Sequence, residues 1–231
     1  MYLYVLRVVA GAGRLRGVGE LAVLSSLPSV VVVFFALVTQ LADPWFVFSL
    51  LMGLYVWPRG GLTRRDAAQL LGLSLAAAAL VLTLKTGIGV PRPPGSSTAS
   101  IPGWLPWPLS RAFGRVAVAD GFGFPSGHAT GAPVLYGGLA AMLEWRRRRV
   151  QALIAGLLIV GVMLSRLVLG VHFLVDVLAG VVLGTSMLWL GLRGVEPTRL
   201  FGLAAVVAVA GGGRTVATVP VQRPRPPAPG V

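Results

Sequence analysis

The sequence has no cysteine and few charged residues. Of its 231 residues, 12% are charged and 55% are apolar, with a mean hydropathy of +0.82, whereas about a quarter of the residues in soluble domains are charged. The lack of cysteine excludes disulfides, thiol nucleophiles and thiolate metal sites, and leaves the redox compartment open. This composition excludes a disordered chain and an ordinary cytosolic enzyme, so we interpret the chain as a one-domain integral membrane protein.

Acidic residues, lysine and histidine are also scarce. There are 7 acidic residues against 20 basic ones, which gives a net charge of +13. All basic residues except Lys85 are arginine, and the histidines are His128 and His172. The arginines form short clusters between apolar runs rather than one polar face, which argues against nucleic-acid binding. The single lysine and the two histidines are therefore the first candidates for a chemical role.

Long apolar runs predict an all-α membrane bundle with six spans, since about 20 apolar residues in a helix cross a bilayer. The predicted spans are residues 21–41, 45–57, 67–84, 128–143, 150–165 and 173–192. Residues 200–210 fit a seventh span, an interfacial helix or a frayed end. We expect an N-terminal cytoplasmic or interfacial segment (1–20), a six-span domain (21–192), and a C-terminal apolar segment with a disordered Pro/Arg-rich tail (193–231). A GxxxG pair, Gly180 and Gly184, predicts close helix packing.

The distribution of arginines predicts the orientation. If the spans alternate, one side collects most of the arginines outside the motifs, and the positive-inside rule assigns that side to the cytoplasm. These residues are Arg7, Arg14, Arg16, Arg59, Arg64, Arg65, Arg146, Arg147, Arg148, Arg149, Arg193 and Arg199. The opposite, extracytoplasmic side carries Asp43 and the long loop at residues 86–125. We expect a multi-pass protein of the plasma membrane.

Lys85 and Arg92 close the third predicted span, in the stretch KTGIGVPRP. Glycines and prolines end the helix there and let the chain turn, so both cations can converge on one anion. The alternative is that both side chains extend to the lipid headgroups.

Ser126, Gly127 and His128 stand at the start of the fourth predicted span. Ser126 suits a helix cap, and Gly127 allows a close approach to the backbone. Free N–H groups at a helix N-terminus bind anions. The alternative is a capping serine beside an interfacial histidine.

Arg166, His172 and Asp176 link the fifth and sixth predicted spans. His172 and Asp176 are four residues apart and share a helix face, so the carboxylate can accept the imidazole N–H. The other ring nitrogen is then free as a nucleophile or base. Arg166 adds a guanidinium that suits phosphate oxygens. The alternative is a buried structural His–Asp pair.

The three clusters fall on one predicted membrane face. They combine three cations, a helix N-terminus, two histidines and one carboxylate, without the ligands of a usual metal cage. Cations and N–H groups suit the transition-state charge on phosphate oxygens, and two histidines suit a nucleophile and a general acid. We predict phosphoryl transfer without a metal or cofactor at the outer membrane surface.

These clusters resemble the signature of the type 2 phosphatidic acid phosphatase family, also called the lipid phosphate phosphatases. That signature reads K-x6-R-P, P-S-G-H and S-R-x5-H-x3-D, and every specified residue is present at its spacing. The resemblance covers residues 67–192 and implies an all-α bundle with six spans and no metal. Soluble relatives in that family bind vanadate at the same residues.

The resemblance also implies a role for each site residue. His172 would form a phosphohistidine, Asp176 would orient it, and His128 would protonate the leaving oxygen and then activate water. The phosphate would be held by Lys85, Arg92, Ser126, Gly127 and Arg166.

The implied function is a phosphatase for membrane lipid phosphates or pyrophosphates. Polyprenyl pyrophosphate, phosphatidic acid and phosphatidylglycerol phosphate suit the motifs equally. Two other functions stay open: a phosphotransferase that passes the phosphoryl group to a lipid or sugar hydroxyl, and a non-catalytic lipid-binding membrane protein. The predicted partners are the lipid substrate and the bilayer, with no nucleic acid, and the oligomeric state is left open.

Overall fold

The computed structural model describes residues 16–144 and 147–215. Within these ranges the regular elements are helices, and one isolated β-bridge pairs Pro91 with Phe122 within the loop at residues 86–125. The predicted tail beyond residue 215 and most of the predicted N-terminal segment lie outside the described residues. The helical elements are α2 (Glu20–Leu24), α3 (Ser29–Thr39), η1 (Gln40–Ala42), α4 (Pro44–Val56), α5 (Arg64–Ile88), α6 (Leu109–Val116), α7 (Gly127–Ala132), η2 (Pro133–Gly137), α8 (Gly138–Met142), α9 (Arg148–Val168), α10 (Leu174–Gly191) and α11 (Pro197–Thr215).

Three described helices, α5, α9 and α10, are long and apolar enough to cross a membrane. They correspond to the predicted spans at 67–84, 150–165 and 173–192. A fourth crossing is possible by length and composition if α3–η1 and α4, which are bent by 46° relative to each other, count as one span. The first two predicted spans therefore form one bent pair, and the total of six stays a prediction.

The first predicted span, residues 21–41, is interrupted between α2 and α3. The hydroxyls of Ser25 and Ser26 donate back to the carbonyls of Ala22 and Val23, at 2.9 and 2.8 Å. Pro28 then occupies the N-cap of α3 and has no N–H for a helical bond. Local serine bonds and a proline together explain why one continuous helix does not form.

The fourth predicted span, residues 128–143, is a run of α7, the π-helical turn η2, and α8. The π turn begins at Pro133, which cannot donate to the preceding turn. Helix α10 packs tightly against α7 at two glycines. A Cβ on Gly184 would lie 2.1 Å from the carbonyl oxygen of Thr130, and a Cβ on Gly180 would lie 2.6 Å from the carbonyl oxygen of Ser126. The close packing predicted for this GxxxG pair is confirmed.

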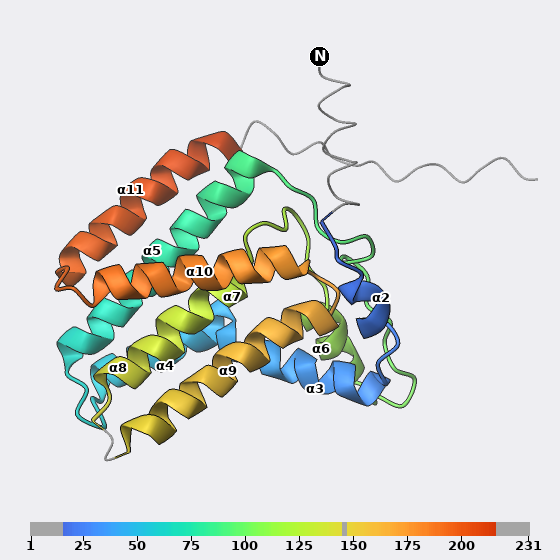
Figure 1. Cartoon of the computed structure of the whole chain (residues 1–231), viewed down its shortest axis with the longest axis horizontal. Coiled ribbons are helices and arrows are strands. Elements are labelled where there is room, and N and C mark those ends of the chain that lie inside the picture. The colour runs from blue at the N-terminus through green and yellow to red at the C-terminus, as the bar shows by residue number, and fades with distance from the viewer. Residues whose placement is uncertain (1–15, 145–146, 216–231) are drawn as a thin grey trace, which may run out of the picture.

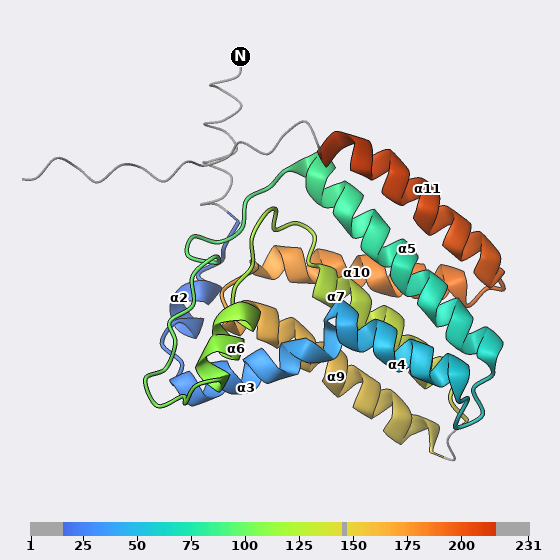
Figure 2. The same ribbon diagram turned by 180° about the vertical axis from the view of Figure 1, so that it is seen from behind.

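Helix α5 is the scaffold that carries the first motif. Thr63 and Asp66 form a capping box at its start, and Gly89 ends it in the left-handed conformation, with φ of 67°. Both views in Figures 1 and 2 show α11 alongside α5. A Cβ on Gly72 would lie 3.0 Å from the Cβ of Leu200. The apolar segment at 200–210 is thus a helix packed against the bundle.

The core lies between α4, α5, the α7–α8 run and α9, around the buried Leu51, Leu70, Leu135 and Val162. The outward faces of the bundle carry large exposed apolar side chains, which is unusual for a soluble protein and suits contact with lipid. They include Phe34, Leu37, Leu153, Leu157, Val182, Trp189 and Val206.

The loop at 86–125 contains a short helix, α6, that the sequence did not predict. Its Phe113 is buried and packs with Ala36 of α3 and with Ala117. This anchor holds the loop against the bundle and brings Arg115 to the site described next.

Candidate active site

The three sequence clusters meet at one polar cavity of about 260 Å³. It lies where α5 and α9 end and where α7 and α10 begin, with α6 and its following loop on one side. Its charged and titratable lining side chains are Asp43, Lys85, Arg92, Arg115, His128, Arg166 and His172. Residues far apart in the chain thus form one strongly cationic chamber.

His172 is 1% exposed, and its two ring nitrogens have different surroundings. Nη1 of Arg92 lies 2.9 Å from Nε2. Because a guanidinium can only donate, Nε2 accepts this hydrogen bond and the proton sits on Nδ1. Nδ1 lies 3.5 Å from Oδ2 of Asp176. This tautomer leaves a lone pair on Nε2 at the cationic cavity.

The His172 ring is also held neutral. Burial, and next the positive charges of Arg166 and Arg92, hold the pKa of His172 well below its usual range. A histidine nucleophile must be unprotonated on the attacking nitrogen. The environment of this ring therefore suits attack on an electrophile.

Asp176 is fully buried at the start of α10. Its Oδ2 accepts from the N–H of Phe173 at 3.0 Å, and its backbone carbonyl accepts from the N–H of Ser126 at 3.0 Å. The carboxylate is thereby fixed to the first turn of α10, and the same residue ties α10 to the start of α7.

Arg16 also contacts Asp176, through Oδ1. Its Nη1 donates to the carbonyl of Pro91 at 3.0 Å, and its guanidinium lies 5.8 and 5.3 Å from the ring centroids of Phe124 and Phe173. The assignment of Arg16 to the face opposite the site was wrong. Charge counting places a residue by the span beside it, whereas this arginine is held by buried partners at the site.

Arg166 is 4% exposed and is anchored by a residue of α3. Its Nη1 donates to Oγ1 of Thr39, itself buried, at 2.6 Å. Its Nε has no hydrogen-bond partner within the described part of the chain. The guanidinium therefore lines the cavity with donor capacity that the protein leaves unused, which suits an oxyanion.

The second motif places its three residues differently. Ser126 is fully buried and its hydroxyl accepts from the N–H of Ala129 at 3.4 Å, so it caps α7 as predicted. Gly127 and His128 line the cavity. The hydroxyl oxygen of Ser126 acts as the acceptor in this cap, and the part of Ser126 in phosphate binding stays a prediction. Nε2 of His128 lies 3.1 Å from Oδ1 of Asp43.

Four residues around the site were not predicted to belong to it: Arg16, Thr39, Asp43 and Arg115. The contacts of Thr39 with Arg166 and of Asp43 with His128 span 127 and 85 residues of chain. Local spacing contains no signal for such contacts. The available hint was one acid, Asp43, between two apolar runs.

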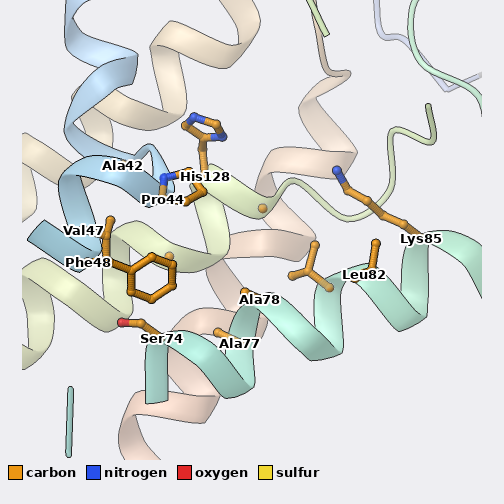
Figure 3. Close-up of a pocket in the computed structure, with 13 residues that line it drawn as sticks. Ala42, Pro44, Val47, Phe48, Ser74, Ala77, Ala78, Leu82, Lys85 and His128 are labelled. Atoms are coloured by element: carbon orange, nitrogen blue, oxygen red, sulfur yellow. The ribbon is translucent and has the colours of Figure 1, made fainter. Parts of the chain in front are cut away.

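A second, apolar cavity of about 270 Å³ adjoins the polar one, since Lys85, Gly127 and His128 line both. Figure 3 shows it between α4 and α5, with Lys85 and His128 at one end and apolar side chains below them. The remaining lining is almost wholly apolar: Ala42, Pro44, Val47, Phe48, Ser74, Ala77, Ala78, Val81, Leu82 and Gly131. Together the two cavities suit a phosphate joined to a hydrocarbon chain.

Comparison with known proteins finds a family model and a curated relative. The model of the PAP2 superfamily matches residues 67–200. The chain is 36% identical over 84 residues to phosphatidylglycerophosphatase B of Bacillus subtilis (strain 168), a match that covers 34% of this chain and 41% of that protein. The chain thus matches less than half of that relative's length.

Two crystal structures share the fold. Aquifex aeolicus LpxE has a TM-score of 0.56 at 21% identity, covering 77% of this chain and 95% of that one. The first transmembrane PAP2 type phosphatidylglycerolphosphate phosphatase from Bacillus subtilis has a TM-score of 0.57 at 23% identity, covering 83% of this chain and 92% of that one. At these identities the likeness establishes the helical architecture.

Proposed function

This chain belongs to the PAP2 superfamily, as its motifs indicated, and from that premise we propose that it is a membrane phosphatase for lipid phosphates or pyrophosphates. The observation that carries the proposal is the pair of ring nitrogens of His172. Nε2 faces the cationic cavity, 2.9 Å from Nη1 of Arg92, and Nδ1 faces Asp176 at 3.5 Å. A neutral, oriented imidazole among cations suits attack on a phosphate.

In the first step Nε2 of His172 attacks phosphorus and the bond to the lipid oxygen breaks. Arg92, Lys85 and Arg166 stabilise the negative charge on the equatorial oxygens. Arg92 turns from Nε2 to a phosphate oxygen when substrate binds, which exposes the lone pair. His128 gives its proton to the leaving oxygen, and the products of this step are the lipid alcohol, or the lipid monophosphate, and a phosphohistidine.

In the second step water attacks the phosphohistidine. His128, now neutral, takes a proton from the water as the oxygen bonds to phosphorus. The phosphorus–nitrogen bond breaks, inorganic phosphate leaves, and both histidines return to their starting states. Asp176 stabilises the charged His172 ring during the first step and holds its orientation in both.

The lipid class of substrate is supported by the two adjoining cavities. A phosphate among Lys85, Arg92 and Arg166 leaves its ester chain beside the apolar cavity at Lys85 and His128. Exposed apolar faces on the outer helices suit access from the bilayer. Polyprenyl pyrophosphate, phosphatidic acid and phosphatidylglycerol phosphate all meet these requirements.

We place the site on the extracytoplasmic side. Lys85 and Arg166 stand near the C-terminal ends of α5 and α9, and a belt of arginines stands at the opposite helix ends. The positive-inside rule puts that belt in the cytoplasm. Its members in the described residues are Arg59, Arg64, Arg65, Arg147, Arg148, Arg149, Arg193 and Arg199.

The test is phosphate release by detergent-purified protein in EDTA, from the three lipid substrates in parallel. We expect release that EDTA does not abolish, that is lost in His172→Ala, and that passes through an acid-labile phosphoenzyme absent from that variant. Normal turnover by His172→Ala would overturn the assignment of the nucleophile. A labelled phosphoenzyme that yields product only when a lipid or sugar hydroxyl is added would identify a phosphotransferase instead.

A further inference from the structure

We infer that Asp43 is a positioning residue for His128. Its carboxylate holds the imidazole at the polar cavity and stabilises the protonated form that delivers a proton to the leaving oxygen. This inference rests on the proposed function, in which His128 is the general acid. The family motifs do not contain Asp43, and the interaction joins the bend between η1 and α4 to the first turn of α7.

The geometry places the two side chains in direct contact at the site. Oδ1 of Asp43 lies 3.1 Å from Nε2 of His128, and both residues line the polar cavity. Their side chains are 26% and 20% exposed. Because both side chains also line the cavity, a bound substrate can contact them.

Helix capping alone does not account for Asp43. The residue occupies the N-cap of α4, where an aspartate usually accepts from the N–H groups of the first turn. Here its side chain makes no capping hydrogen bond. Its Oδ1 is directed to His128 instead, across 85 residues of chain.

The charged groups around the cavity explain why His128 needs a carboxylate beside it. The groups facing His128 are Asp43 from the bend before α4, Lys85 from α5, Arg92 from the following loop, Arg115 from α6, Arg166 from α9 and His172 before α10. Among the described side chains that line the cavity, Asp43 is the one acid. The cations oppose protonation of His128, so a general acid there needs a nearby carboxylate.

The two histidines consequently have different hydrogen-bond partners. Nε2 of His172 accepts from Arg92, which keeps that ring neutral. Nε2 of His128 lies against a carboxylate, which favours a proton on that nitrogen. This difference in partners suits His172 to attack phosphorus and His128 to donate a proton.

A double-mutant cycle tests whether Asp43 acts through His128. Asp43→Asn keeps the size of the side chain and its capacity to cap α4, and Asp43→Ser is a second variant that also suits a cap. We expect Asp43→Asn to lower kcat by about 10- to 100-fold in the wild-type background. In the His128→Ala background it should lower kcat by less than about 2-fold, because its target is absent. An equal loss in both backgrounds would overturn the inference.

The pH profile provides the second readout. Without the carboxylate, His128 loses its proton more readily, so the alkaline limb of kcat for Asp43→Asn should move to lower pH. Asp43→Glu should move it back toward the wild-type position. Asp120→Asn is the matched control, since Asp120 lies at the same end of the bundle and contacts Arg92 through its backbone carbonyl; its alkaline limb should stay in place.

The outcomes separate this inference from the proposed function. An active wild-type protein whose alkaline limb does not move in Asp43→Asn would refute the role of Asp43 and leave the phosphatase intact. If the wild-type protein releases no phosphate from any of the three lipids, the proposed function fails and the inference fails with it.

Discussion

The guanidinium of Arg16 contacts the buried carboxylate of Asp176 and so joins the segment before α2 to the start of α10. The same carboxylate faces Nδ1 of His172 at 3.5 Å. Arg16 therefore supports the residue that orients the proposed nucleophile. It also places this part of the N-terminal segment at the site, where neither the charge distribution nor the motifs predicted it.

Replacing Arg16 with alanine should destabilise the protein and lower its activity. The change leaves Asp176 buried without its cationic partner, and breaking a buried ion pair in this way costs about 3–5 kcal/mol. The matched control is Arg65→Ala, because the Arg65–Glu196 pair is exposed, with side chains 66% and 52% accessible, and such pairs contribute about 0–1 kcal/mol. Thermal unfolding in detergent compares the two, and equal shifts in Tm would contradict a buried structural role for Arg16.

Arg166→Lys should lose most of its activity although the positive charge remains. A lysine cannot donate to Oγ1 of Thr39 and to a phosphate with the planar geometry of a guanidinium. We expect kcat/KM to fall about 10²-fold, as when one transition-state donor is removed. Thr39→Val, which removes only the anchor, should have a smaller effect in the same direction. Unchanged kinetics in Arg166→Lys would show that the residue binds no phosphate.

The acid limb of the pH profile should depend on Arg92. Burial and nearby cations lower the pKa of His172, so the nucleophile stays neutral and the wild-type protein stays active below the usual histidine range. Arg92→Gln removes one of these charges and the donor on Nε2, which raises the pKa of His172. The acid limb of kcat/KM should then move to higher pH. Arg115→Gln, which changes a cavity arginine without a described contact to His172, should move it less.

Gly184→Ala should disrupt the packing that aligns the two halves of the site. Its new Cβ would lie 2.1 Å from the carbonyl oxygen of Thr130, so α10 must separate from α7. Overpacking of this kind costs about 1–3 kcal/mol or more, and activity should fall because His128 and His172 stand on opposite sides of that contact. Gly156→Ala is the control: its Cβ would meet no atom within 4 Å, and alanine favours a helix by about 1 kcal/mol. Melting temperatures and phosphate release measure both effects.

Ala78→Trp should discriminate between substrates by chain length. A tryptophan at this position fills part of the apolar cavity of about 270 Å³ and leaves the polar cavity unchanged. We expect kcat/KM to fall at least about tenfold for a long-chain lipid phosphate and much less for a short-chain alkyl phosphate, because only the former loses apolar contacts. Leu153→Trp, on the exposed face of α9, serves as the control. Equal losses on both substrates would show that the cavity does not hold the chain.

The amino-acid sequence was sufficient to predict three long apolar helices and the convergence of the three motifs. The motif residues Lys85, Arg92, His128, Arg166 and His172 all line one cavity, as the placement of three clusters on one face required. That prediction succeeded because apolar runs fix which ends of successive spans share a membrane face. The predicted contact of His172 with Asp176 is present, but the shared helix face is not. His172 precedes Phe173, the N-cap of α10, and its ring meets the carboxylate across the start of that helix.

Local irregularities were visible in the sequence without being decisive. Pro28 and Pro133 each mark an interruption, at the start of α3 and in the π turn. A proline removes one helical hydrogen bond. Whether the helix then ends, bends or forms a π turn depends on how the neighbouring segments pack against it.

Which residues support the proposed catalytic groups depends on the packing of the whole bundle. Arg16 reaches Asp176, Thr39 anchors Arg166, and Asp43 meets His128, in contacts that join separate helices. Helical periodicity relates residues three or four apart, and hydropathy assigns a residue only to one end of a span. Which side chains meet across the bundle depends on the rotation and crossing of packed helices, and the close packing that sets both involves the whole chain at once.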